Sequence, residues 1–221
     1  MTSGETLETA QQRYYDLYAG TYHRWIAGYL SDVRDEIAAL MHASPALHGD
    51  VLECAPGSGE LTALLSGMAS HVTAVDGSRA MLDILRDRAL PHVTAVHADL
   101  FTWEPDRQWD AAFMANWLSH VPPGKVGSFF DTLSRAVRPG GSVIVLDVTA
   151  KEMFVESRRW EECGVPVVER IANGEAFPVV KVFWEPDVLL GHLGRCGWSG
   201  EATTIGAELG RGFVYYELWR S

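Results

Sequence analysis

The sequence has few cysteines, and this shortage excludes some classes of protein. The three cysteines are Cys54, Cys163 and Cys196, and they lie far apart in the chain. An odd, widely spaced set is typical of reduced thiols and argues against a disulfide framework or a metal cluster. We therefore expect a cytoplasmic protein with no metal site, in which each cysteine is a small buried apolar residue.

Basic charge and long apolar runs are also scarce. The chain has 18 Lys and Arg against 29 Asp and Glu, a formal net charge of −11, and its longest basic run is Arg158–Arg159. This balance argues against a nucleic-acid backbone or an anionic membrane as the main partner. No apolar run is long enough to span a bilayer, and the polar start "MTSGETLETAQQ" has no apolar core of a signal peptide.

The central part of the chain alternates short apolar runs with helical stretches. The expected strands are Asp50–Cys54, His71–Asp76, His92–His97, Trp109–Ala115 and Ser142–Val148. The expected helices are Glu60–Met68, Arg79–Arg88 and Lys125–Val137, the last ending at the turn "RPGG". This alternation predicts a doubly wound α/β fold, a parallel sheet covered on both faces. At 221 residues, one domain is the default.

The two flanks of this core differ from it. We expect residues 1–48, which are rich in aromatic side chains, to be helical and to precede the core of residues 49–150. Residues 151–221 begin with a helix-like stretch, "KEMFVESRRWEE", and continue with the hairpin Pro166–Trp184, whose turn is "ANGE". A helix in "EPDVLLGHLGRCG" and the closing strand "RGFVYYELWR" complete the chain.

A glycine turn follows the first expected strand, in "ECAPGSGE". Gly57 and Gly59 allow the backbone to turn sharply and to approach a ligand. A dinucleotide-binding turn has a third glycine, where this chain has Thr62, and a phosphate-binding P-loop ends in Gly-Lys-Ser/Thr, which is missing. The turn by itself therefore identifies no ligand.

Acidic side chains follow three successive strands and narrow the choice of ligand. Glu53, Asp76 and Asp99 lie at these strand ends. Asp76 is placed to accept hydrogen bonds from a ribose diol and Asp99 from an exocyclic amine, with the apolar faces of Leu100 and Phe101 beside it. Three acids repel a pyrophosphate and attract a ligand that carries an amino group and a sulfonium.

Five stretches resemble the successive motifs of class I S-adenosylmethionine-dependent methyltransferases. They are "VLECAPGSGELT", "VTAVDGSRAMLDILRDRA", "VTAVHADLFTWEP", "WDAAFMANWLSHVP" and "LSRAVRPGGSVIVLDV". The resemblance covers roughly residues 14–149. It implies a Rossmann-like sheet of seven strands with an antiparallel last strand, S-adenosylmethionine as cofactor and S-adenosylhomocysteine as product.

The resemblance also implies a set of cofactor-binding residues. The family's glycine motif and its acidic residues match positions of this sequence directly. Ala55 stands where many members of the family have glycine. In this family the N-terminal segment covers the cofactor as a lid. The implied residues are Tyr14, Tyr22, Glu53, Ala55, Gly57, Gly59, Asp76, Gly77, Met81, Asp99, Leu100, Phe101, Asn116 and Trp117.

Four residues are candidates for the acceptor side. His120 follows the fourth strand, where a neutral imidazole can act as a general base, although a histidine there can equally brace the next loop. Tyr18 belongs to the aromatic face of the first helix. Lys181 and Arg158 either meet an acidic substrate or are solvated surface residues.

The family analogy favours methyl transfer to an oxygen, nitrogen or carbon of a small molecule, in secondary metabolism. Two alternatives stay open. One is a non-methylating enzyme on the same fold that performs a cyclisation, a rearrangement or a ring-forming displacement. The other is a non-catalytic S-adenosylmethionine-binding partner. The expected assembly is a monomer or homodimer, with or without a pathway partner.

Overall fold

A seven-stranded sheet forms the centre of the molecule. The computed structural model describes residues 5–155 and 158–221. The sheet has the order β3-β2-β1-β4-β5-β10-β9, and β10 is antiparallel to both of its neighbours while the first five strands are parallel. This arrangement confirms the predicted doubly wound fold with an antiparallel last strand. The strands are β1 Asp50–Cys54, β2 His71–Asp76, β3 Val93–His97, β4 Trp109–Ala115, β5 Val137–Val148, β9 Trp198–Ile205 and β10 Phe213–Arg220.

Helices cover both faces of this sheet. Residues of α5 and α6 pack on one face, and residues of α2, α3 and α4 pack on the other. The helices are α1 Leu7–Tyr29, α2 Arg34–Ala43, α3 Thr62–Leu65, α4 Arg79–Asp87, α5 Val126–Ala136 and α6 Pro186–Gly194. The short helical turns are η1 Pro45–His48, η2 Leu118–His120, η3 Pro123–Lys125, η4 Ala150–Val155 and η5 Ala207–Leu209.

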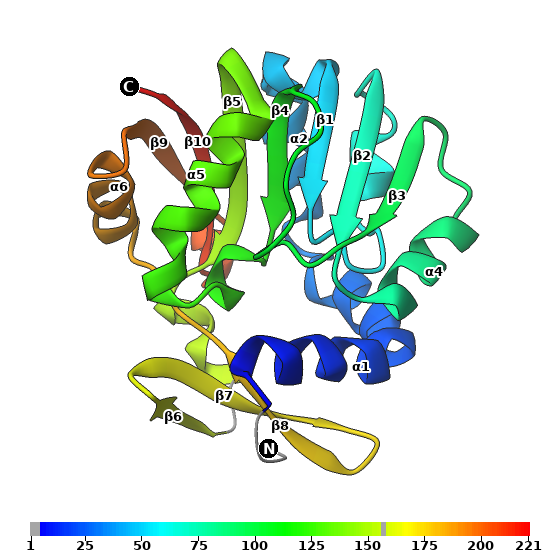
Figure 1. Cartoon of the computed structure of the whole chain (residues 1–221), viewed down its shortest axis with the longest axis vertical. Coiled ribbons are helices and arrows are strands. Elements are labelled where there is room, and N and C mark those ends of the chain that lie inside the picture. The colour runs from blue at the N-terminus through cyan, green and yellow to red at the C-terminus, as the bar shows by residue number, and fades with distance from the viewer. Residues whose placement is uncertain (1–4, 156–157) are drawn as a thin grey trace.

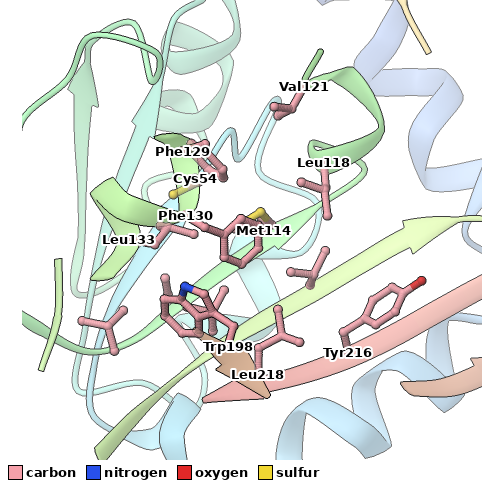
Figure 2. Packing of buried hydrophobic residues seen from close by; sticks show 14 of the residues in the cluster. Cys54, Met114, Leu118, Val121, Phe129, Phe130, Leu133, Trp198, Tyr216 and Leu218 are labelled. Atoms are coloured by element: carbon pink, nitrogen blue, oxygen red, sulfur yellow. The ribbon is translucent and has the colours of Figure 1, made fainter. Parts of the chain in front are cut away.

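The apolar strand residues alternate between two cores because successive side chains of a strand point to opposite faces. In β1, Leu52 and Cys54 join the core under α5, whereas Val51 joins the core on the other face. Under α5 the ring of Phe130 meets that of Trp198 edge to face, with centroids 5.6 Å apart (Figure 2). The two cores fix the sheet, and with it the positions of the loops at its carboxyl edge.

The long helix α1 crosses the carboxyl ends of the parallel strands, and a second sheet lies on its far side (Figure 1). That sheet consists of β6 Arg159–Glu162, β7 Val165–Ala172 and β8 Glu175–Val180, in the order β6-β7-β8. The predicted hairpin is therefore confirmed, with its turn at Asn173 and Gly174. Tyr14 of α1 packs against Phe177 of β8.

Three local expectations were wrong. The stretch 151–162 is not one helix, because Arg159–Glu162 pairs with β7 as strand β6. The expected helix Glu60–Met68 shrinks to Thr62–Leu65, and Gly67 closes a tighter turn by donating to the carbonyl of Leu64. Cys163 is exposed, since it occupies the β6–β7 turn with a φ of 52°.

The "RPGG" turn lies inside β5 instead of before it. The ladder between β4 and β5 pairs Trp109 with Val137 and then resumes at Ala111 and Ser142. Gly140, at a φ of 83°, supplies the left-handed backbone of this bulge.

Among the described residues, no helix combines the length and apolar character that crossing a membrane requires. Within the same ranges, no group of three or more His, Cys, Asp or Glu side chains is arranged to hold a metal ion.

Candidate active site

A cavity of about 550 Å³ is lined by residues of α1 and by residues at the carboxyl ends of the parallel strands. Its floor is made by the loops that follow β1 to β5, and residues of α1, β7 and the segment after β8 complete its walls. Ligands of doubly wound sheets bind at this edge, where the strand order reverses. The cavity is therefore the candidate site.

The glycine turn after β1 supplies part of the floor. Ala55 and Gly57 line the cavity, and both have a positive φ, 53° and 56°. A Cβ atom at Gly57 would lie 3.3 Å from the ring of Tyr22, so the small residue lets α1 approach the turn. Gly59 has a different role, because it lies outside the cavity and a Cβ there would collide with Leu85.

Asp76 ends β2 and joins the glycine turn to the next loop. Its carboxylate accepts hydrogen bonds from the backbone N–H groups of Gly57, at 3.0 Å, and Ser78, at 2.7 Å. Burial raises the pKa of Asp76 to about 6, against the opposing effect of these hydrogen bonds. Two of the four acceptor positions of the carboxylate are used in this way, and both Asp76 and Gly77 line the cavity.

Glu53 lies beneath the turn and not in the main cavity. It is 2% exposed, and burial raises its pKa to about 8, so it is protonated at neutral pH. Its Oε2 atom has no hydrogen-bond partner among the described residues. Glu53 lines a separate small pocket of about 30 Å³ together with Tyr22 and Asn116.

The loop after β3, together with Met81 of α4, forms an apolar part of the cavity wall. Asp99 accepts a hydrogen bond from the N–H of Phe101 at 2.9 Å, while Leu100, Phe101 and Met81 present apolar surface. Lys125 lies over the ring of Phe101 at 4.9 Å. The predicted residues Met81, Asp99, Leu100 and Phe101 thus come together along one part of the cavity wall.

Asn116 and Trp117 follow β4 and connect this end to the rest of the cavity. Asn116 adopts a φ of 52° and donates its N–H to the carbonyl of Leu146, which holds the loop against β5. Both residues line the cavity, and Trp117 contacts Phe101 with ring centroids 5.5 Å apart.

His120 is buried and engaged at both ring nitrogens. Nδ1 lies 2.7 Å from the carbonyl oxygen of Val180, and because that oxygen only accepts, Nδ1 carries the proton. Burial, together with the nearby charge of Lys181, lowers the pKa of His120 well below its usual range. The ring is therefore neutral, and its Nε2 accepts from the hydroxyl of Tyr15 at 3.0 Å.

Cationic groups lie beside this histidine. Lys181 donates to the Ser119 hydroxyl at 2.9 Å, and the backbone N–H of Ser119 donates to the buried carboxylate of Asp147 at 2.8 Å. Lys181 and Arg170 both line the cavity. The other predicted cation, Arg158, is exposed, pairs with Glu169 at 3.3 Å and lies outside the residues that line the cavity.

The aromatic face of α1 forms the roof. Tyr14, Tyr18 and Tyr22 all line the cavity; Tyr14 is also buried against the small sheet, with the ring of Tyr18 stacked on it at 5.2 Å. Sequence reasoning singled out these three and missed Tyr15. Tyr15 lies in the same aromatic-rich helix, but the spacing of aromatic residues along a helix does not show which ring meets His120.

Gln11 and Arg170 were also missed. Gln11 donates to the carbonyl of His120 at 3.2 Å and accepts from the N–H of Val180 at 3.1 Å, so it joins α1 to both. A glutamine in a helix and an arginine in a hairpin carry no sequence signal for a site.

Comparisons with known proteins agree with this geometry. A family model described as a methyltransferase domain matches residues 51–141. Demethylmenaquinone methyltransferase of Clavibacter sepedonicus is 30% identical over 128 residues, which are 57% of this chain and 51% of that protein, so the chain spans about half the length of this relative. The same enzyme of Tropheryma whipplei is 26% identical over 186 residues, 79% of this chain and 76% of that protein.

Solved structures match over nearly the whole chain. The DhpI–SAH complex is 36% identical, covers 97% of this chain and 97% of its own, and superposes with a TM-score of 0.82. The DhpI–SAM–HEP complex has the same identity and TM-score, with 98% of this chain and 99% of its own covered. Fold, motifs and relatives agree, and the chain belongs to the class I S-adenosylmethionine-dependent methyltransferases.

Proposed function

We propose that the protein transfers a methyl group from S-adenosylmethionine to an anionic oxygen of a small molecule and releases a methyl ester and S-adenosylhomocysteine. Those predicted cofactor residues that line the cavity support this donor. Asp76 has two acceptor positions for the ribose hydroxyls, and Met81, Leu100 and Phe101 provide apolar surface for a purine whose amine meets Asp99. When bound, the donor supplies an already activated methyl group.

The observation that carries the choice of acceptor is the group of side chains around His120. Lys181 and Arg170 line the cavity, and both are close enough to His120 for their charges to lower its pKa. An acceptor that carries a carboxylate or phosphate group beside His120 is therefore attracted by these two cations. The net charge of the whole chain, −11, opposes this attraction. The preference for an anion therefore depends on these local cations.

The state of His120 also favours an acidic oxygen over an alcohol. A histidine whose pKa is lowered well below its usual range is a weak base, and abstraction of an alcohol proton by it is strongly unfavourable. An oxygen acid is already ionised at neutral pH, so its methylation needs no proton transfer to the hydrogen-bonded pair of Tyr15 and His120. The remaining requirement is alignment of the oxygen with the methyl group and exclusion of water by α1.

A substrate panel tests this proposal. The protein, S-adenosylmethionine and matched pairs of carboxylates or phosphates and their neutral amides or alcohols would be assayed for S-adenosylhomocysteine and for methyl esters. We expect turnover of the acids only, and a KM at least tenfold higher in Lys181→Met and Arg170→Met. Equal turnover of the neutral compounds, or an unchanged KM in both variants, would contradict an anionic acceptor.

The similar DhpI–SAM–HEP complex holds HEP together with SAM, and this supports a small-molecule acceptor for the present chain.

A further inference from the structure

The cavity has an apolar end that neither the donor residues nor the cationic group explains. Trp25, Ile26, Tyr29, Val148 and Phe183 line this end. None of them is among the residues expected to hold the cofactor. Apolar wall beyond what the proposed donor and anionic group need indicates room for a further part of a ligand.

The aromatic rings of α1 run without interruption from His120 to this apolar end. The centroid of Tyr15 lies 5.6 Å from that of His120 and 6.0 Å from that of Tyr22. Tyr22 lies 5.9 Å from Trp25, and Trp25 is stacked on Tyr29 at 4.6 Å. We call Tyr15, Tyr22, Trp25 and Tyr29 the aromatic wall. It connects the proposed reaction centre to the apolar end.

The far end of the wall is held rigidly. The hydroxyl of Tyr29 donates to Glu152 at 2.8 Å, and the guanidinium of Arg211 lies 4.9 Å from the centre of the Tyr29 ring. Arg211 in turn pairs with Glu152 at 3.2 Å. Trp25, stacked on this fixed ring, remains 45% exposed. A rigid, exposed indole binds apolar groups at low entropic cost.

The cationic group adjoins the apolar end. The Lys181 ammonium lies 5.7 Å from the centre of the Phe183 ring, and Phe183 packs against the same core cluster as Tyr29 and Val148. We propose that Trp25, Tyr29, Val148 and Phe183 form a subsite for an alkyl or aryl portion of the acceptor. This inference rests on the proposed function, and it makes the acceptor an amphiphilic acid, with its anionic group at Lys181 and an apolar body along the aromatic wall.

A homologous series separates the two parts of such a ligand. Binding of n-alkyl carboxylates and n-alkyl phosphates, from ethyl to hexyl, would be measured by calorimetry on protein saturated with S-adenosylhomocysteine. Burial of each added methylene strengthens binding by about fourfold in an apolar subsite, from about 0.8 kcal/mol per CH₂. The slope of affinity against chain length reports the apolar subsite, and the affinity of the ethyl compound reports the anion site.

We expect a steep slope for the wild type, a slope reduced by half or more in Trp25→Ala, and a restored slope in Trp25→Phe. Trp219→Ala is the matched control, since Trp219 is 39% exposed on β10 and lies outside the cavity lining. A flat series in the wild type, or a slope that Trp25→Ala leaves unchanged, would overturn the subsite.

Failure of the proposed function gives a different result. Lys181→Met weakens every member of the series by a common factor if the anion binds at Lys181, and it leaves the slope unchanged. If this variant binds the ethyl compounds as the wild type does, the anion site is refuted while a steep, Trp25-dependent slope still supports the apolar subsite.

Discussion

Asp76→Asn is the sharpest test of the donor site. In the wild type, one carboxylate oxygen accepts from Gly57 and the other from Ser78, which leaves one acceptor position on each for a ribose hydroxyl. The amide has a single acceptor oxygen, so one backbone N–H loses its partner and one hydroxyl loses its acceptor. The other hydroxyl keeps a neutral hydrogen bond in place of a charge-assisted one.

The expected loss of affinity for S-adenosylmethionine follows from the number of hydrogen bonds that Asp76→Asn removes or weakens. Replacing charge-assisted hydrogen bonds to two hydroxyls costs about 2 kcal/mol in binding, which corresponds to a dissociation constant for S-adenosylmethionine about 30-fold higher. Isothermal titration calorimetry at pH 7.5 measures this directly. Asp83→Asn is the matched control, because Asp83 is an exposed residue of α4 that pairs with Arg86.

The same carboxylate predicts a pH dependence with a definite sign. Burial raises the pKa of Asp76 to about 6 in the free protein, and hydroxyl donors favour its ionised form, so the bound pKa is lower. The affinity is therefore fully present above pH 6 and falls by up to about tenfold per unit as the pH drops below it. A pH-independent affinity in the wild type, or the same dependence in Asp76→Asn, would refute the assignment of Asp76.

Three further predictions concern other parts of the site. Burial raises the pKa of Glu53 to about 8, so Glu53 takes up a proton on folding and the free energy of unfolding falls as pH rises from about 4.5 to 8. Glu53→Gln should therefore raise the melting temperature more at pH 8 than at pH 5. An equal gain at both pH values would contradict this. Tyr15→Phe should lower kcat less than tenfold if the acceptor oxygen is already ionised, whereas a loss of a hundredfold or more would indicate general-base catalysis through His120. Gly59→Ala should lower the free energy of unfolding, measured by urea denaturation, by about 1–3 kcal/mol more than Gly140→Ala does. Both glycines have a φ near 80°, but only at Gly59 would the added Cβ collide with Leu85. Similar losses in the two variants would contradict the steric explanation.

Most of the sheet and many of the residues that line the cavity could be predicted from the sequence. Strands β1, β2 and β4 have the expected bounds, because strands buried on both faces leave continuous apolar runs between turn residues. Asp76 and Asp99 line the cavity because the carboxyl ends of parallel strands meet at one edge.

The acceptor side could not be predicted to the same degree. Its contacts join segments far apart in the chain, such as Tyr15 with His120 and Lys181 with Ser119, and no local pattern encodes such pairs. Glu53 lies in the expected place along β1, but the sequence could not show that its side chain is buried beneath the turn. Strand β6 escaped detection because its pairing with β7 determines its conformation, and its own sequence favours a helix.

A mass balance of the reaction tests the central proposal most directly. The purified protein would be incubated with methyl-labelled S-adenosylmethionine and an accepted acid, and S-adenosylhomocysteine and labelled methyl ester would be quantified together. Methyl transfer predicts one labelled ester for each S-adenosylhomocysteine formed. Conversion of the acid without S-adenosylhomocysteine, or binding of S-adenosylmethionine without turnover of any acid in the panel, would contradict it.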